Sequence, residues 1–201
     1  MLSNYYVVPG VLTRNECEQV ILNSRKFATD SIIDGDEYSG TLTPTIRNSK
    51  SCFIDHGTCL DPILRKVQMA FREVAFDFYK FPICHLEPFS YVEYGEGMFY
   101  EWHFDSGSFP DKIDRDLSAS LILSDSQDYE GGRLEIQMAG NEIEMQNGIP
   151  IKRSLVKAIS IEERQGMMVI FPSLFLHQVP KIKKGKRSSL VLWARLSLIH
   201  I

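Results

Sequence analysis

Residues 99–105 read FYEWHFD, and this stretch decides how the second half of the chain is interpreted. Its mixture of aromatic and polar side chains is typical of a strand, in which residues two positions apart point to the same side. His103 and Asp105 therefore project from one face, and Phe104 projects from the other. Spacing alone thus brings together two side chains that can bind a metal ion. Because the pattern His-x-Asp occurs often by chance, the pair needs further support.

Short segments of strand type surround this stretch from residue 88 onward. They are FSYVEYG, FYEWHFD, RDLSASLILS, GGRLEIQ, LVKAIS, GMMVIFP, HQVPKI and RSSLVLWARLSLI. Many short strands at this spacing predict a sandwich or barrel rather than alternating β-α units. Gly131, Gly132 and Gly166 mark turns or bulges, because glycine accepts a positive φ without strain.

The preceding part of the chain shows a helical pattern instead. Thr13 followed by Glu16 is a capping box, which opens a helix, and a second helix is predicted from Asp61. Between them, residues 29–40 are predicted to form a loop and residues 43–55 an extended segment. The expected fold is mostly β with N-terminal helices, in the α+β class.

A chain of 201 residues is long enough for one domain with a full core. We therefore expect a single domain over residues 1–201. Residues 1–85 form its N-terminal helical support, and residues 86–201 form an antiparallel β core of jelly-roll type.

Composition restricts the class of partner. A formal net charge of −4 gives no basic surface for a phosphate backbone, so nucleic acid is not an expected partner. The N-terminal MLSNYYVVPGVL lacks a basic leader region, and the longest apolar run, GMMVIFPSLFL, is too short to span a bilayer. We expect a soluble, cytoplasmic protein with no membrane contact.

The four cysteines form no Cys-x-x-Cys pair and are predicted to be reduced packing residues.

A third metal ligand is offered by His177, in the segment FPSLFLHQVP. An apolar strand turns there at Pro172 and leads into another extended piece, which a jelly roll can return beside residues 103–105. Two imidazoles and one carboxylate on one triangular face form the ligand set associated with non-haem Fe(II) oxygenases. The other histidines, His56, His85 and His200, lack a partner at ligand spacing and are interpreted as structural or surface residues.

Ten positions after His177 comes Arg187, which opens the strand RSSLVLWAR. Alternation puts four residues on one face of that strand: Arg187, Ser189, Val191 and Trp193. The planar fork of an arginine can hold a carboxylate through two parallel hydrogen bonds. A dicarboxylate co-substrate could thus bind the metal at one end and Arg187 at the other. In the basic run of residues 181–187, only Arg187 is expected to point inward.

The segments that carry these residues resemble a known family. EYGEGMFYEWHFD, RDLSASLILSD, DYEGGRLEI and GMMVIFPSLFLHQVPKIKKGKRSSLVLWAR are similar, in order and spacing, to 2-oxoglutarate and Fe(II)-dependent dioxygenases. The likeness is to the prolyl 4-hydroxylase-like superfamily and, within it, to the PKHD-type hydroxylases. It extends over residues 91–195. It implies a double-stranded β-helix, the jelly roll of the cupins.

The resemblance also implies the roles of individual residues. His103, Asp105 and His177 would be the catalytic iron ligands, and Arg187 would bind the far carboxylate of 2-oxoglutarate. Ser189 would support Arg187.

Two tyrosines match family tyrosines near the co-substrate, Tyr94 and Tyr100. For Tyr100 the strand parity is wrong, because a residue three positions from His103 faces the opposite side unless the strand bulges or begins later. A further hydroxyl that some relatives supply from the strand RDLSASLILS is either missing here or supplied elsewhere.

The implied reaction uses Fe(II), 2-oxoglutarate and O2, with ascorbate as a candidate reductant, and releases succinate and CO2. The implied substrates are a peptidyl proline, another side chain or a free amino acid. Because Asp105 is present, hydroxylation is favoured over halogenation. Residues 30–45 and 106–114 are expected to shape the mouth of the site, but the sequence indicates neither the substrate nor the oligomeric state.

Two alternatives remain open. A nucleic-acid alkyl-repair oxygenase would share the metal ligands, but the acidic charge balance counts against it. A non-catalytic, cupin-like metal-binding or sensing module would have no need for the carboxylate anchor Arg187.

Overall fold

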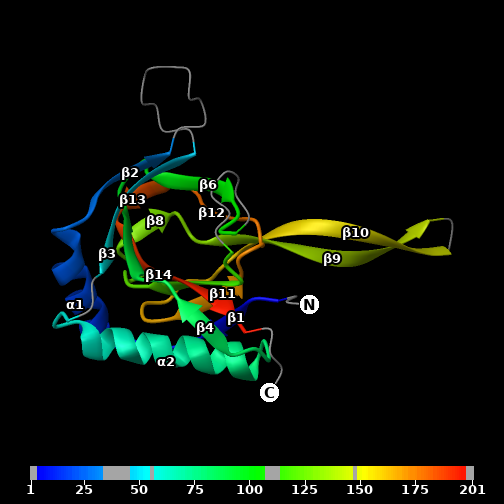
Figure 1. The fold of residues 1–201 in the computed structure, drawn as a ribbon. Coiled ribbons are helices and arrows are strands. Elements are labelled where there is room, and N and C mark those ends of the chain that lie inside the picture. Colours follow the sequence, from blue (N-terminus) through cyan, green and yellow to red (C-terminus); the bar gives the residue numbers. More distant parts are fainter. Residues whose placement is uncertain (1–3, 34–45, 55–56, 107–113, 147–148, 198–201) are drawn as a thin grey trace.

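A curled antiparallel sheet carries most of the chain, and two helices pack against it (Figure 1). The computed structural model describes residues 4–33, 46–54, 57–106, 114–146 and 149–197. The helices are α1 (Arg14–Arg25) and α2 (Asp61–Asp77). The strands are β1 (Tyr6–Val8), β2 (Thr29–Ile33), β3 (Arg47–Ile54), β4 (Ile83–Leu86), β5 (Phe89–Tyr94), β6 (Phe99–His103), β7 (Leu117–Ile122), β8 (Tyr129–Gly131), β9 (Glu135–Gln146), β10 (Ile149–Ser160), β11 (Met168–Pro172), β12 (His177–Val179), β13 (Ile182–Gly185) and β14 (Arg187–Leu196). The predicted mostly-β class with N-terminal helices is confirmed.

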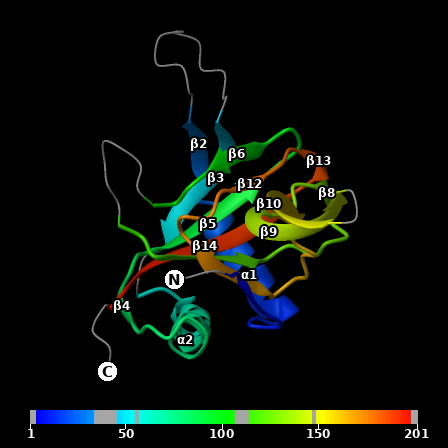
Figure 2. The same cartoon turned by 90° about the vertical axis from the view of Figure 1, so that its right-hand side faces the viewer.

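The main sheet has twelve strands, in the order β1-β11-β7-β14-β5-β3-β6-β12-β9-β10, with β2 beside β3 and β4 beside β14. Its pairings are antiparallel. A separate ladder joins β8 to β13. Strand β14 lies between β5 and β7, at the centre of the sheet (Figure 2).

The N-terminal part of the chain contributes strands as well as helices. Strand β3 lies between β5 and β6, and β1 pairs with β11. Residues 29–33 form strand β2, so the prediction of a loop was wrong for this part of residues 29–40. The polar composition suggested a loop, but the backbone of β2 finds a partner in β3, from Thr29 opposite Ser51 to Ile33 opposite Arg47. Such pairing outweighs a weak intrinsic preference.

The two helices cover the outer side of the sheet, and the main core lies between the helices and the sheet. The predicted capping box begins α1: the Thr13 hydroxyl accepts from the Glu16 amide, and the Glu16 carboxylate accepts from the Thr13 amide. The core combines apolar residues of α1 and α2 with those of the central strands, among them Val20, Val67, Phe71, Leu190 and Leu192. Alternate residues of β14 thus pack against the helices, which leaves the other face of this strand for the inside of the sheet.

Strands β9 and β10 form a long hairpin that projects from the body of the molecule (Figure 1). Both strands are longer than the segments GGRLEIQ and LVKAIS predicted.

The described residues contain no helix that is both long and apolar enough to cross a membrane. All four cysteines are free; Cys17 is buried, but Cys59 and Cys84 are exposed, so the prediction of packing residues was wrong for these two.

The turn between β10 and β11 depends on Gly166. Its φ is +80°, and a Cβ atom at this position would lie 2.0 Å from the carbonyl oxygen of Leu12. Its amide donates to Ile122, and its carbonyl accepts from Leu12. No side chain fits here without moving the backbone. The turn position predicted for Gly166 is therefore confirmed, as are the positive φ angles expected at Gly131 and Gly132.

Candidate metal centre and co-substrate pocket

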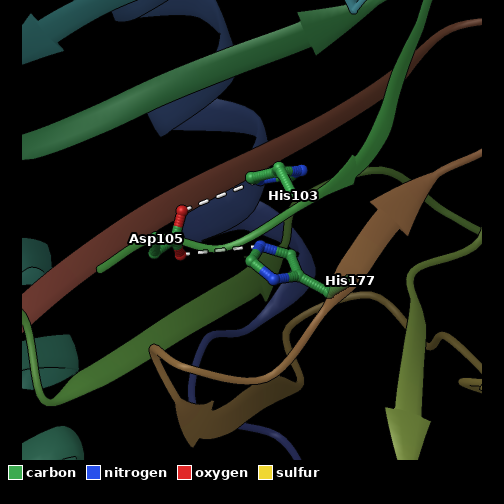
Figure 3. Close-up of side chains that lie close together, drawn as sticks. All are labelled: His103, Asp105 and His177. Carbon is green, nitrogen blue, oxygen red and sulfur yellow. Dashed lines mark ion pairs between the residues drawn. The ribbon is translucent and has the colours of Figure 1, made fainter. Parts of the chain in front are cut away.

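Three predicted side chains converge at the point where β6 and β12 meet (Figure 3). His103 ends β6, Asp105 follows two residues later, and His177 begins β12 directly opposite His103. Their potential ligand atoms all lie within 4.8 Å of one another. His103 Nε2 lies 3.7 Å from one oxygen of Asp105, and His177 Nε2 lies 3.5 Å from the other. Phe104 points to solvent, as alternation predicted.

Hydrogen bonds to the backbone set the orientation of both imidazoles. His103 Nδ1 lies 2.7 Å from the carbonyl oxygen of Glu101, and His177 Nδ1 lies 2.9 Å from that of Phe175. Because a carbonyl can only accept, each Nδ1 carries the proton and each Nε2 presents a lone pair. Two lone pairs and a carboxylate thus face one another with no proton between them. This donor set fits a divalent cation of the type bound by two histidines and a carboxylate.

The protonation of the cluster agrees with this donor set. Burial, followed by repulsion from His177, lowers the pKa of His103 to about 3, so the ring is neutral near pH 7. Burial opposes ionisation of Asp105, but the two histidines and Ser118 hold its pKa below the usual value. The carboxylate is therefore ionised.

Two buried serines hold Asp105 in place. Ser118 Oγ donates to Asp105 Oδ2 over 2.6 Å and lies 2.8 Å from Ser173 Oγ. The backbone amide of Asp105 donates to the carbonyl of Ser173. Neither serine was predicted as a site residue, because hydroxyl groups in strands carry no signal of their own in the sequence.

A cavity that opens partly to solvent adjoins the cluster. All seven residues predicted for the site line it: His103, Asp105, His177, Arg187, Ser189, Tyr94 and Tyr100. Four alternate residues of β14 line it, as predicted: Arg187, Ser189, Val191 and Trp193. Ser120 of β7 also lines it, so this strand offers a hydroxyl to the cavity after all.

Arg187 is the largest charged group buried at this cavity, with its side chain only 1% exposed. Its Nη1 donates to Ser189 Oγ over 3.4 Å, and its guanidinium carbon lies 5.9 Å from the ring centre of Tyr94. Sequence reasoning missed its acidic partner, Glu163, which lies 2.6 Å from Nη2. Burial opposes the charge of Arg187, but Glu163 outweighs burial and raises the pKa of the guanidinium above its usual value.

Tyr100 lies on the same side as His103, contrary to the parity argument. The two rings stack with centroids 3.4 Å apart and planes 11° apart. The pairing of β6 with β12 is irregular: His103 opposes His177, but Tyr100 opposes Val179, so two residues of β6 between these pairs stand opposite one residue of β12. Such a bulge reverses the facing of a side chain. Burial raises the pKa of Tyr100 to about 12.

Arg47 is a second arginine at the cavity that sequence reasoning missed. Its guanidinium lies 4.8 Å from the ring centre of Tyr100, and its Nε donates to Ser49 Oγ. It belongs to β3, in an extended segment whose sequence carries no chemical signal.

The remaining sequence predictions concern residues away from the cavity. His85 is exposed on β4, in agreement with a surface role. In the basic run, Lys181, Lys183, Lys184 and Lys186 are exposed and Arg187 is buried, as expected. His56, His200 and most of the two mouth segments, residues 34–45 and 107–113, lie outside the described residues.

Comparisons with known proteins agree with this geometry. A family model described as the 2OG-Fe(II) oxygenase superfamily matches residues 89–195. A PKHD-type hydroxylase from Shewanella baltica is 26% identical over 198 residues, which cover 92% of this chain and 75% of that protein. A PKHD-type hydroxylase from Hyphomonas neptunium is 32% identical over 107 residues, which cover 52% of this chain and 41% of that protein.

Solved structures show the same fold. A Pseudomonas putida prolyl-4-hydroxylase has a TM-score of 0.68 at 20% identity, over 96% of this chain and 92% of that one. A prolyl hydroxylase from Trichoplax adhaerens, in complex with a hypoxia inducible factor oxygen degradation domain peptide fragment, has a TM-score of 0.65 at 19% identity. The match covers 94% of this chain and 82% of that one. The viral collagen prolyl hydroxylase of Paramecium Bursaria Chlorella virus-1, a 2OG complex, has a TM-score of 0.63 at 18% identity, over 96% of both chains. The predicted jelly roll is confirmed.

Proposed function

We propose, because this chain belongs to the 2OG-Fe(II) oxygenase superfamily, that it hydroxylates an amino-acid side chain, with a peptidyl proline as the first candidate. Other side chains and free amino acids are the next candidates. As an oxygenase of this superfamily, the chain uses Fe(II), 2-oxoglutarate and O2. We infer that each hydroxylation converts 2-oxoglutarate to succinate and CO2. The observation that carries the proposal is that one cavity contains both the His-Asp-His cluster and a buried arginine.

We assign the metal to His103, Asp105 and His177. Their Nε2 atoms and carboxylate oxygens converge, and backbone carbonyls keep the proton of each imidazole on Nδ1. When bound there, Fe(II) would supply the activation of O2 and the oxidation of a substrate C–H bond. The protein contributes the orientation of these ligands. Ser118 holds the Asp105 carboxylate, and Tyr100 stacks on His103 and restricts rotation of its ring.

We assign the far carboxylate of 2-oxoglutarate to Arg187. The guanidinium is buried and lies at the same cavity as the metal ligands, beside Ser189 and Tyr94. Charged hydrogen bonds of this kind each contribute about 1.5–3 kcal/mol. Apolar walls from Leu134, Phe171 and Val179 would exclude water from the bound co-substrate.

Support for a peptide substrate comes from the relatives alone. The related structures are prolyl hydroxylases, and one of them is in complex with a peptide fragment. The curated relatives are PKHD-type hydroxylases. The predicted cytoplasmic location remains a prediction.

The test is succinate formation from 2-oxoglutarate by the iron-loaded protein in the presence of O2 and ascorbate. Proline-rich peptides, other peptides and free amino acids are compared, and mass spectrometry detects the gain of one oxygen. We expect turnover to rise with a proline-containing peptide and to be lost in Asp105→Ala. The control Asp77→Ala removes an exposed carboxylate at the end of α2 and should leave turnover unchanged. Absence of both 2-oxoglutarate binding and succinate formation in the iron-loaded wild type would refute the proposal.

A further inference from the structure

We propose that Glu163 is the positioning residue of the co-substrate anchor: it holds one edge of Arg187 and balances its charge while the cavity is empty. This inference rests on the proposed function, because it assigns the far carboxylate of 2-oxoglutarate to Arg187. It adds a residue that does not touch the co-substrate and that sets the preference of the site for a dianion.

Glu163 and Arg187 form a fully buried ion pair, with side chains 0% and 1% exposed. Glu163 Oε1 accepts from Arg187 Nη2 over 2.6 Å and from Nε over 3.2 Å, and Oε2 accepts from Nε over 3.1 Å. The carboxylate has two further donors, the backbone amide of Leu134 and the hydroxyl of Tyr129. Five contacts from three residues therefore fix its position.

These contacts decide which edge of the guanidinium is available. Arginine presents its N–H donors as a rigid planar fork. Glu163 occupies the edge formed by Nε and Nη2, whereas Nη1 contacts Ser189. Arg187 and Ser189 line the cavity, but among the described lining residues there is neither Glu163 nor Tyr129. A carboxylate in the cavity therefore meets the Nη1 side of Arg187, with Glu163 behind it.

The charge of Glu163 has two opposite effects. In the empty cavity it compensates a cation that has almost no contact with water, and an uncompensated charge there would destabilise the fold. Once the co-substrate is bound, the same guanidinium lies between two carboxylates, which repel each other. Glu163 therefore weakens the binding of a distal carboxylate through its charge and strengthens it through the position that it gives to Arg187.

Two variants separate charge from position. Glu163→Gln removes the charge but keeps an oxygen that can accept from Arg187 and Leu134, and its amide nitrogen can donate to the Tyr129 hydroxyl. Tyr129→Phe keeps the charge but removes one of the groups that hold Glu163 in place. Binding of 2-oxoglutarate and of 2-oxopentanoate, which has the same carbon chain without the distal carboxylate, is measured by calorimetry on the Mn(II)-loaded proteins.

We expect the two variants to change the preference for 2-oxoglutarate over 2-oxopentanoate in opposite directions. Glu163→Gln should raise it about tenfold, because the repulsion between two carboxylates near one cation is removed. Tyr129→Phe should lower it about threefold, because Arg187 is held less firmly. In both variants the affinity for 2-oxopentanoate and for Mn(II) should stay as in the wild type.

A purely structural role for Glu163 would lower stability in both variants and leave the preference unchanged, which would refute the inference. Changes of the same sign would also refute it. If Glu163→Gln does not fold, the Tyr129→Phe variant decides. An unchanged preference for 2-oxoglutarate over 2-oxopentanoate in that variant would contradict the inference. Failure of the proposed function is separate from these outcomes, because it would appear as a Mn(II)-loaded wild type that does not bind 2-oxoglutarate.

Discussion

Replacing Arg187 with methionine should reduce both stability and co-substrate binding, by amounts that follow from its contacts. The variant removes three hydrogen bonds to Glu163 and leaves that carboxylate buried, with its side chain 0% exposed. Removing one partner of a buried ion pair costs about 3–5 kcal/mol. We therefore expect the free energy of unfolding of Arg187→Met to fall by this amount.

A second change should restore part of the loss. In the double variant Arg187→Met/Glu163→Gln, the uncompensated charge is gone, and the glutamine still accepts from the Leu134 amide. Because a neutral group is far less costly to bury than a carboxylate, we expect the double variant to be about 2 kcal/mol more stable than Arg187→Met. A double-mutant cycle from urea unfolding, followed by circular dichroism, measures this coupling.

The same variants test the carboxylate anchor. Loss of two charged hydrogen bonds to the co-substrate predicts at least about a hundredfold weaker binding of 2-oxoglutarate in both, with unchanged affinity for Mn(II). Arg47→Met is the matched control, because it removes the other guanidinium at the cavity, which stacks on Tyr100. It should weaken 2-oxoglutarate binding less than about tenfold. The reasoning is refuted if Arg187→Met is as stable as the wild type, or if Arg47→Met is the variant that loses co-substrate binding.

Three further predictions concern the metal site and the turn before β11. Ser118→Ala loses the 2.6 Å hydrogen bond to Asp105 and should bind Mn(II) about tenfold more weakly in calorimetry; unchanged affinity would mean that the serine does not orient the ligand. Mn(II) at about a hundred times its dissociation constant should stabilise the wild type by about 2.7 kcal/mol, reversibly with a chelator. The same addition should not stabilise Asp105→Ala, and an equal gain would exclude Asp105 as a ligand. Gly166→Ala, whose Cβ would lie 2.0 Å from the Leu12 carbonyl, should lower the free energy of unfolding by more than about 1 kcal/mol in urea; a neutral result would contradict the close approach.

The metal cluster could be predicted because two of its members are related by local geometry. Residues 103 and 105 share a face in any regular strand, and the same alternation placed Arg187 and Ser189 on the cavity side of β14. The position of His177 depended on the expected jelly roll, because nothing local indicates which strand it pairs with. The structure shows that its partner in the sheet is His103.

Alternation failed at Tyr100 for a physical reason. The facing of a strand residue depends on regular pairing with the neighbouring strand, and the bulge between β6 and β12 interrupts that pairing. The same dependence on a partner explains strand β2, whose polar residues become a strand only because β3 lies beside them. Neither feature is encoded within a short window of sequence.

Glu163 could not have been selected from the sequence, because its neighbours have the same character. Glu162, Glu163 and Arg164 follow one another in a segment that reads as a solvated turn. In the structure Glu162 and Arg164 are largely exposed and pair with each other, whereas Glu163 is buried. The path of the backbone alone decides that the Glu163 carboxylate is buried and the Glu162 carboxylate is exposed.

That path links the anchor of the cavity to a distant part of the chain. Arg187 opens the central strand β14, where its side chain has almost no contact with water, so a lone guanidinium would be too costly to bury there. The turn before β11 supplies the compensating Glu163, and Gly166 fixes that turn against Leu12, in the segment that leads into α1. Glu163 and Gly166 therefore belong to one turn, which contacts Arg187 through Glu163 and Leu12 through Gly166. A substitution in the turn should thus reach the co-substrate site through Arg187, although neither Gly166 nor Glu163 is among the described residues that line the cavity.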